Sequence, residues 1–451
     1  TRSMNELATL YIESMQVLKD ASSASIYGSR AANGVIIITT RKGKKGTTVD
    51  FSASNTFVSK KKPYDLMNTE QRGIAQYWAI KNDNPNADPN KVGLGWVDGY
   101  GGIYQYQDHK DANGNYVLDK VSWREFLDPE PGRQTMRTAD TDWQKEVLRT
   151  GYIQQYNVTL STGSDSGNAL FALDYYNNKG TVKGSYFNRI NARMNSDYSW
   201  LNGKVKVGEN FTVSKWRRNI NNFTTGSDDE IFNRAKGLMS AVPVHTVDGG
   251  WGGPTGGMSD RQNPVRLIED NKDNYEDNLR LFGNAYASVE ILKGLTFRSS
   301  FGLDLTGTWR RLMELKFQSG SVSSDRNKLT QKSGYDFNWN NSNILQYVFD
   351  ANKHNFDVML GQETIQRNYA EMGASRMDYG FETPDYMILN SGEREPNNDG
   401  YNSNHTMISW FGKMNYNYDD RYLASFTLRR DASSVFGDNN PWATFPAFSL
   451  G

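Results

Sequence analysis

The sequence predicts an all-β membrane barrel of antiparallel, up-and-down strands, with a small α+β domain in its lumen. Three observations predict this fold. From residue 47 onward, segments of about ten residues alternate apolar and polar side chains, short and long connections alternate between these segments, and residues 1–46 lack the alternation. About twelve strands can be counted in residues 47–451. Such a sheet has two unpaired edges, so either the barrel closes at about twelve strands or more strands complete it.

Composition excludes several classes of protein. The 51 basic and 51 acidic residues balance, so no excess of positive charge points to a nucleic acid partner. No stretch approaches the roughly 18 consecutive apolar residues of a membrane-spanning helix. The absence of cysteine excludes disulfides, thiolate metal sites and cysteine catalysis, and an aromatic content of 13% with 41 glycines favours strands.

The first 46 residues predict a strand, helix, strand unit. "YIESMQVL" (11–18) is typical of a short strand, Asp20 can cap a brief helix that stops at Gly28, and Asn33-Gly34 turns the chain into "VIIITT" (35–40). The second strand is apolar on both faces, so we expect protein to cover it on both sides. No signal peptide opens the chain, and we expect the beginning of an exported protein to lie upstream of Thr1.

Two stretches show the alternation clearly. In "GLTFRSSFGLDL" (294–305), five apolar residues and Ser299 share one face, opposite Thr296, Arg298, Ser300 and Asp304. In "YFNRINARMNSDY" (186–198), Ile190, Ala192 and Met194 oppose a polar set. We expect that polar set to face the lumen: Arg189, Asn191, Arg193, Asn195 and Asp197.

The connections predict which ends of the strands share a rim. Short connections fall near 161–168, 200–204, 292–294, 350–353 and 418–421, and long ones span 60–150, 217–279, 309–333 and 367–403. This order places the tight turns on one rim and the long loops on the extracellular rim. Aromatic residues beside the short turns suit a membrane interface, although ordinary hairpin-end aromatics are an alternative: Tyr198, Trp200, Tyr347, Phe349, Tyr416, Tyr418 and Tyr422.

Four motifs together resemble one family. They are "IESMQVLKDASSASIYGSRAANGVIIITTRKGKKG" (12–46), "DTDWQKEVLRTGYIQQYNVTLSTG" (140–163), "YYNNKGTVKGSYFNRINARMNSD" (175–197) and "FGKMNYNYDDRYLASFTLRRDASSVFG" (411–437), followed by "FPAFSLG". The chain resembles SusC/RagA-type TonB-dependent outer-membrane transporters. Gln16 stands where the family usually shows an acidic residue, and Ala432 where glycine is common.

The resemblance implies a barrel of about 22 strands with a plug domain in its lumen. Residues 1–46 would then be the C-terminal part of the plug, and 47–451 the N-terminal part of the barrel, so we expect the sequence to be a fragment whose TonB box lies upstream. The plug motif would be a structural hinge and packing element that the lumen-facing residues hold by contacts water can replace. Its residues are Lys19, Asp20, Tyr27, Gly28, Arg30, Asn33 and Gly34.

The implied function is TonB-dependent active import of an oligomeric nutrient, an oligosaccharide or a peptide, across the bacterial outer membrane. The implied partners are a SusD-like surface lipoprotein as a lid, the TonB-ExbB-ExbD complex and the lipid bilayer. The alternative is a receptor or adhesion barrel that binds ligand and signals without transport, and a barrel that merely scaffolds an enzyme is a weaker one.

No catalytic motif is present in the sequence. The four histidines lack metal spacing, and neither a nucleophile elbow, a P-loop nor H-E-x-x-H occurs, so we expect no enzyme and no required cofactor. "DANGNYVLD" (111–119) sets Asp111, Asn113, Asn115 and Asp119 around Gly114, which resembles a calcium loop. It lacks the final acidic ligand of the full pattern, and a plain Asn-Gly turn is the alternative.

The long loops are rich in aromatic residues. These side chains could stack on sugar rings, contact a lid protein or pack the loops together. The candidates for substrate or partner contact are Trp96, Tyr100, Tyr104, Trp123 and Trp251.

Overall fold

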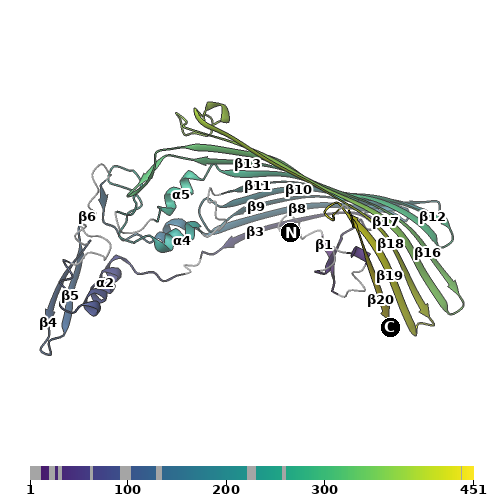
Figure 1. The fold of residues 1–451 in the computed structure, drawn as a ribbon, viewed down its shortest axis with the longest axis horizontal. Helices are drawn as coiled ribbons and strands as arrows, with labels where there is room; N and C mark the ends of the chain where they lie inside the picture. Colours follow the sequence, from purple (N-terminus) through teal and green to yellow (C-terminus); the bar gives the residue numbers. More distant parts are fainter. Residues whose placement is uncertain are drawn as a thin grey trace.

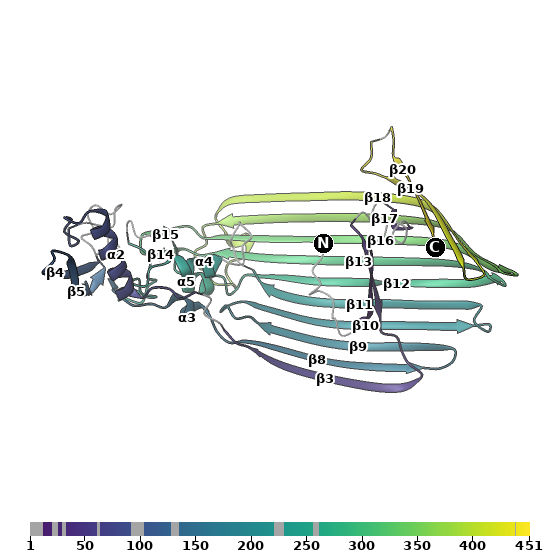
Figure 2. The ribbon, with the colours of Figure 1, turned by 90° about the horizontal axis from the view of Figure 1, so that it is seen from below.

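One large antiparallel sheet dominates the computed structural model (Figure 1, Figure 2). The structure describes residues 12–19, 26–28, 33–60, 64–91, 103–127, 135–220, 230–255, 261–437 and 439–451. The sheet has twelve strands, each paired with the next one along the chain. They are β3 (Gly46–Val58), β8 (Gly151–Gly163), β9 (Gly167–Lys179), β10 (Tyr186–Trp200), β11 (Val205–Asn219), β12 (Tyr275–Leu292), β13 (Leu295–Glu314), β16 (Lys328–Ala351), β17 (His354–Met377), β18 (Arg394–Tyr418), β19 (Tyr422–Ser433) and β20 (Trp442–Leu450).

This topology confirms the predicted up-and-down arrangement of about twelve strands. The tight turns, including 201–204, 293–294 and 352–353, join neighbouring strands at one rim, and the helices lie beyond the other rim (Figure 2). Among the described residues, β3 pairs only with β8 and β20 only with β19, so these two strands form the edges of the sheet. No helix of the described residues is long and apolar enough to cross a membrane.

The two faces of the sheet confirm the predicted alternation. On β10, Arg189 is 5% exposed and Asn191 1%, whereas Ile190 is 55% exposed and Met194 52%. This pattern reverses that of a soluble protein, in which apolar side chains are buried and charged ones lie outside. We call the face of Arg189 the inner face and the face of Ile190 the outer face. Water and protein suit the inner face, and the hydrocarbon of a bilayer suits the outer face.

Several strands continue into the predicted long loops. β13 ends at Glu314 and β16 begins at Lys328, so the connection between them is shorter than 309–333. Likewise, β17 runs to Met377 and β18 starts at Arg394, inside 367–403. On β18 the cause is that both faces become polar toward this end, as in "REPNNDG", so the alternation fades while the backbone pairing continues.

The long connections carry their own small elements. They are α2 (Thr69–Asp83), β4 (Tyr104–Lys110), β5 (Tyr116–Trp123), β6 (Phe126–Leu127), β7 (Met136–Arg137), α3 (Trp143–Val147), α4 (Glu230–Gly237), α5 (Pro264–Asp270), β14 (Phe317–Ser319), β15 (Val322–Ser324) and η4 (Leu389–Ser391). Asn68 and Gln71 form a capping box at the start of α2. An apolar core joins two of the long connections, since Trp143 and Val147 of α3 pack with Ile231 and Ala235 of α4.

The N-terminal segment, by which we mean the described residues between 12 and 46, forms a separate unit. β1 (Ile12–Leu18) and β2 (Val35–Thr40) pair antiparallel in a two-stranded sheet, and residues 26–28 form a 3₁₀ turn. Of the predicted helix over 21–27, residues 21–25 lie outside the described residues, and its end falls in the 3₁₀ turn. Figure 1 shows β1 on the concave side of the large sheet.

The expectation that protein covers both faces of β2 is wrong for the described residues. Ile36 is 60% exposed and Thr39 is exposed as well, because β2 pairs with β1 alone in a two-stranded sheet.

Candidate functional site

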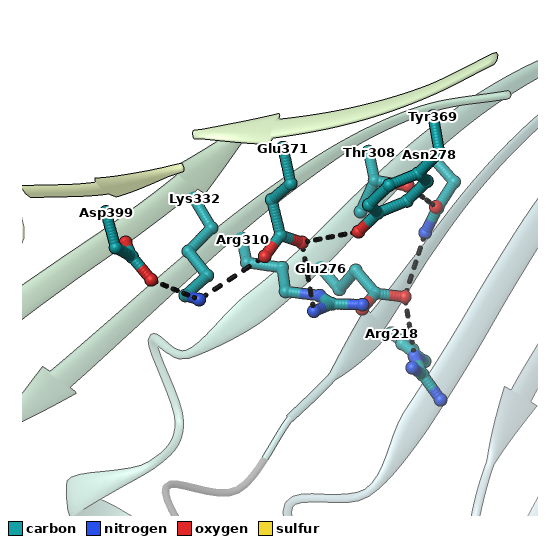
Figure 3. Close-up of polar contacts among 9 residues, drawn as sticks. All are labelled: Arg218, Glu276, Asn278, Thr308, Arg310, Lys332, Tyr369, Glu371 and Asp399. Atoms are coloured by element: carbon teal, nitrogen blue, oxygen red, sulfur yellow. Dashed lines mark hydrogen bonds and ion pairs between the residues drawn. The ribbon is translucent and has the colours of Figure 1, made fainter. Parts of the chain in front are cut away.

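A row of charged side chains crosses the inner face toward the long-loop rim, and we call it the charge row. Arg218 on β11 pairs in register with Glu276 on β12, and Glu276 with Arg310 on β13. Arg310 in turn pairs with Lys332 on β16. Since register partners on neighbouring strands point to the same face, these side chains come together from four strands (Figure 3).

Ion pairs connect the charge row continuously. Glu276 accepts from Arg218 Nε at 3.0 Å and from Arg310 Nε at 2.5 Å. Glu371 of β17 lies 3.7 Å from Arg310 Nη1 and 3.3 Å from Lys332 Nζ, so it bridges the two cations (Figure 3). Asp399 of β18 closes the row. Three cations and three anions alternate, and each charge contacts an opposite one.

Polar and aromatic groups extend this surface. Asn278 donates to Glu276 and Thr308 donates to Asn278, while the Tyr369 hydroxyl donates to Glu371 at 3.2 Å. The rings of Tyr369 and Tyr401 lie 6.0 Å apart. The side chain of Arg310 is 40% exposed and that of Asp399 61%, so a polar ligand can reach both. This surface can bind by hydrogen bonds and charge, because such exposed pairs exchange readily with water.

Sequence reasoning missed the charge row. Its residues fall inside the predicted loops, and their juxtaposition depends on the register of six strands, which a single strand pattern does not reveal. One local signal was available, since Glu276, Asn278 and Arg280 alternate with Leu279 and Leu281 on β12.

The predicted lumen residues all lie on the inner face, where they form a second polar cluster. Arg189 Nη2 lies 3.1 Å from Asp174 Oδ1, and Asn191 donates to the same oxygen at 3.1 Å. Arg193 donates to Asn210 at 2.7 Å. Asp197 contacts the N-terminal segment, because Lys42 Nζ lies 2.7 Å from its Oδ2.

A third group of contacts holds the N-terminal segment at β19. Arg429 is 1% exposed and donates to the carbonyl of Ile26 at 2.5 Å. The same guanidinium donates to Asp431 at 2.7 Å and to Glu363 at 2.9 Å. Gly28 has a φ of +58°, and a Cβ there would lie 2.5 Å from Asp431 Oδ2. Only glycine therefore permits this close approach.

The predicted plug motif is only partly described. Tyr27 and Gly28 lie in the 3₁₀ turn that Arg429 contacts, and Asn33 and Gly34 form the turn into β2. Lys19 follows β1 and is exposed. Asp20 and Arg30 lie outside the described residues.

The loop aromatics differ in their surroundings. Tyr104 is 3% exposed and packs with Tyr77 and Tyr106, and this burial raises the pKa of Tyr104 to about 12. Its position supports the packing interpretation for that residue. Trp251 stacks on His245 at 4.8 Å, and Trp123 is 38% exposed. Trp96 and Tyr100 lie outside the described residues.

The candidate calcium loop forms the turn of the β4–β5 hairpin. Asp111 Oδ1 accepts from the backbone N–H groups of Asn113 at 2.9 Å and Asn115 at 2.8 Å. Asp119 instead contacts the ring of His109 at 2.9 Å. In the described part of the chain, no three His, Asp or Glu side chains are placed to hold a metal ion. Calcium at this turn stays a prediction.

Comparisons with known proteins fit this architecture. No protein-family model matches the chain. The TonB-dependent receptor SusC of Bacteroides thetaiotaomicron is 28% identical over 98% of the chain and 40% of its own length. The TonB-dependent receptor P39 of Formosa agariphila is 28% identical over 98% of the chain and 38% of its own length.

Solved structures agree on the fold. The RagAB peptide transporter superposes with a TM-score of 0.73 at 25% identity, over 99% of the chain and 49% of the solved one. The RagAB peptide importer in its closed-closed state gives a TM-score of 0.75 at 24% identity, over 98% of the chain and 48% of the solved one. The chain thus spans about 40% of the length of the curated relatives it matches. These similarities confirm the resemblance to SusC/RagA-type TonB-dependent transporters that the sequence motifs indicated, and with it the location in the bacterial outer membrane.

Proposed function

We propose that this chain is part of a TonB-dependent transporter that actively imports an oligomeric nutrient, a glycan or a peptide, across the outer membrane. The observation that carries the proposal is the way the N-terminal segment rests on the inner face. It folds as its own two-stranded unit and is joined to the wall of the sheet through polar contacts such as Lys42 with Asp197 and Arg429 with the Ile26 carbonyl.

These contacts suit a plug that moves under force. Asn195 donates to the Arg41 carbonyl at 2.8 Å and Asn210 to Thr40 Oγ1 at 3.2 Å, so much of the contact is made by single hydrogen bonds. Water can replace such bonds at a net cost of about 1 kcal/mol each. A pull from the TonB-ExbB-ExbD complex could therefore release the plug without unfolding the wall.

The charge row supports a polar cargo. Its balanced cations and anions can exchange their partners for the charged or hydroxyl groups of an oligomer that passes along the inner face. RagAB is described as a peptide importer, which supports a peptide, while the aromatic pair Tyr369 and Tyr401 would also suit a sugar ring.

The proposed lid is a SusD-like lipoprotein on the long-loop rim. The support is the extent of that rim, where the connection 59–150 carries α2 and the β4–β5 hairpin, and the connection 220–274 carries α4 and α5. A capping partner needs such a broad surface, because stable interfaces bury on the order of 1,600 Å² in total.

Uptake by whole cells tests the proposal. Cells that produce the intact protein should accumulate labelled oligosaccharides or peptides, and a proton ionophore or deletion of TonB should stop the accumulation while surface binding persists. A SusD-like lipoprotein should copurify with the intact protein from outer membranes. Binding without energy-dependent accumulation would overturn import and favour the receptor or adhesion alternative.

A further inference from the structure

A groove crosses the outer face over β16 to β20. Its volume is about 1260 Å³, and Gly412 of β18 forms part of its floor. Gly412 pairs in register with Leu360 on β17 and Leu428 on β19, so it faces outward without a side chain between two leucines. Leu360 is 61% exposed and Trp410 59%. The result is an open apolar channel on the membrane side of the wall.

Polar side chains stand at one side of this groove. On β16, Asn343 and Asn341 lie on the outer face between Leu345 and Trp339, and Asn343 donates to Asn341 at 2.8 Å. Ser299 of β13 donates to Asn343 at 2.8 Å, and Asn343 donates to Gln362 of β17 at 3.1 Å. Amide groups on a hydrocarbon-facing surface are costly unless they find hydrogen-bond partners.

Arg430 lies in line with Asn343 and Gln362 across the strands, and it adds a charge to them. Gln362 pairs with Trp410, and Trp410 pairs with Arg430. Arg430 is exposed, and its guanidinium lies 5.0 Å from the ring centroid of Trp442. Within the described parts of the chain, no carboxylate forms an ion pair with it. A cation at this surface favours an anionic partner, because an unpaired charge next to hydrocarbon is costly.

The position of Arg430 along β19 sets the depth in the membrane at which the anionic partner would lie. β19 leaves the tight turn 419–421 and reaches the connection 434–441 on the long-loop rim soon after Arg430. Long loops of outer-membrane barrels are extracellular, so Arg430 stands at the level of the outer leaflet. A guanidinium beside a tryptophan at a membrane interface suits a phosphate group.

We propose that the groove binds one phosphorylated lipid of the outer leaflet. An acyl chain lies over Gly412 between Leu360 and Leu428, and the phosphate accepts hydrogen bonds from Arg430. The proposal goes beyond import and rests on the outer-membrane location alone. An amphiphile fits best, because on the outer face the site joins an apolar channel to the cation of Arg430 and the neutral amides of Asn343 and Gln362.

Lipid retention tests the site. The intact protein would be purified from outer membranes in mild detergent, and phosphorylated lipid per protein would be measured by mass spectrometry after extraction. Arg430→Gln should lower retention about tenfold, the effect of one lost charge-assisted hydrogen bond. Gly412→Leu should lower it similarly by filling the channel, since an added Cβ already lies 3.4 Å from the Leu360 side chain. Lys215→Gln removes an exposed cation of the same face outside the groove and should change nothing.

Unchanged lipid in both groove variants would overturn the proposal, as would an equal loss in Lys215→Gln. If the protein forms a dimer that Gly412→Leu dissociates while lipid retention stays constant, the proposal is overturned, and the groove binds a second copy of the chain. Resistance of the barrel to detergent denaturation at room temperature verifies folding, and Arg430→Gln alone decides the matter if the leucine variant fails to fold.

Discussion

Lys332 Nζ lies 3.2 Å from Asp399 Oδ2 although strand β17 runs between their strands. Both residues have the same register partner on β17, which is Gly373. A Cβ at that position would lie 2.2 Å from Asp399 Oδ1 and 3.3 Å from Lys332 Cγ. The absent side chain therefore leaves the space through which the two charges meet, and it completes the charge row.

Gly373→Ala should separate Lys332 from Asp399. We expect amide exchange of β16 to β18 near this position to accelerate, while global stability falls by no more than about 1 kcal/mol, because exposed ion pairs contribute little. Hydrogen exchange with mass spectrometry measures the first and urea unfolding the second. Gly400→Ala is the control, since its Cβ would meet only the Glu371 carbonyl at an ordinary 3.5 Å. Equal exchange in both variants would contradict the role of Gly373.

Arg429→Met should destabilise the protein by about 3–5 kcal/mol, because Asp431, itself 1% exposed, would keep a buried charge without its partner. Urea unfolding of the intact protein measures the loss. Arg430→Gln, on the same strand but the opposite face, should change stability by less than about 0.5 kcal/mol. In the double variant Arg429→Met with Asp431→Leu, part of the stability should return. A double variant no more stable than the single one would contradict this account.

Membrane physics explains how much of the fold the sequence could predict. The two faces of β10 were predicted correctly, because a wall between lipid and water enforces strict alternation of residues such as Ile190 and Arg189. The alternation ends where the strands leave the bilayer, so the extension of β13 to Glu314 and the start of β16 at Lys328 were missed.

The candidate site was predicted less well than the fold, because pairing between strands decides it. Arg429 and Arg430 are adjacent and chemically identical, yet one contacts the N-terminal segment and the other faces the membrane side. Only the pairing of Arg429 with Phe411 and of Arg430 with Trp410 assigns their faces. The charge row has the same origin, since the lengths of five connections set which charges meet.

Gly28→Ala should loosen the N-terminal segment from the wall. Two effects weaken this contact in the variant. A φ of +58° costs an alanine about 1–2 kcal/mol, and its Cβ would overlap Asp431 and Arg429. Gly46→Ala separates the two causes, since Gly46 has a φ of +88° but open space around it. Limited proteolysis of residues 12–46 should accelerate more in Gly28→Ala than in Gly46→Ala. Equal cleavage rates would show that backbone strain alone matters.

The turn at Asp111 should open at acid pH. Its pKa is lowered because the backbone N–H of Asn115, and that of Asn113, donate to the charged carboxylate. A carboxyl group whose pKa is lower in the folded state stabilises the fold above its ordinary pKa, and this contribution disappears as the pH falls through the lowered value. Amide exchange of the β4–β5 hairpin should therefore accelerate in that acid range, and Asp111→Asn should remove the pH dependence.

The same titration tests calcium at this turn. A bound cation favours the ionised carboxylate, so added calcium should move the acid opening of the hairpin to lower pH if Asp111, Asn113, Asn115 and Asp119 hold the ion. The partners of Asp111 argue for a small shift, because two backbone N–H groups already occupy Oδ1 and Asp119 already contacts His109. Identical midpoints with calcium and with a chelator would leave the Asn-Gly turn as the whole explanation of this motif.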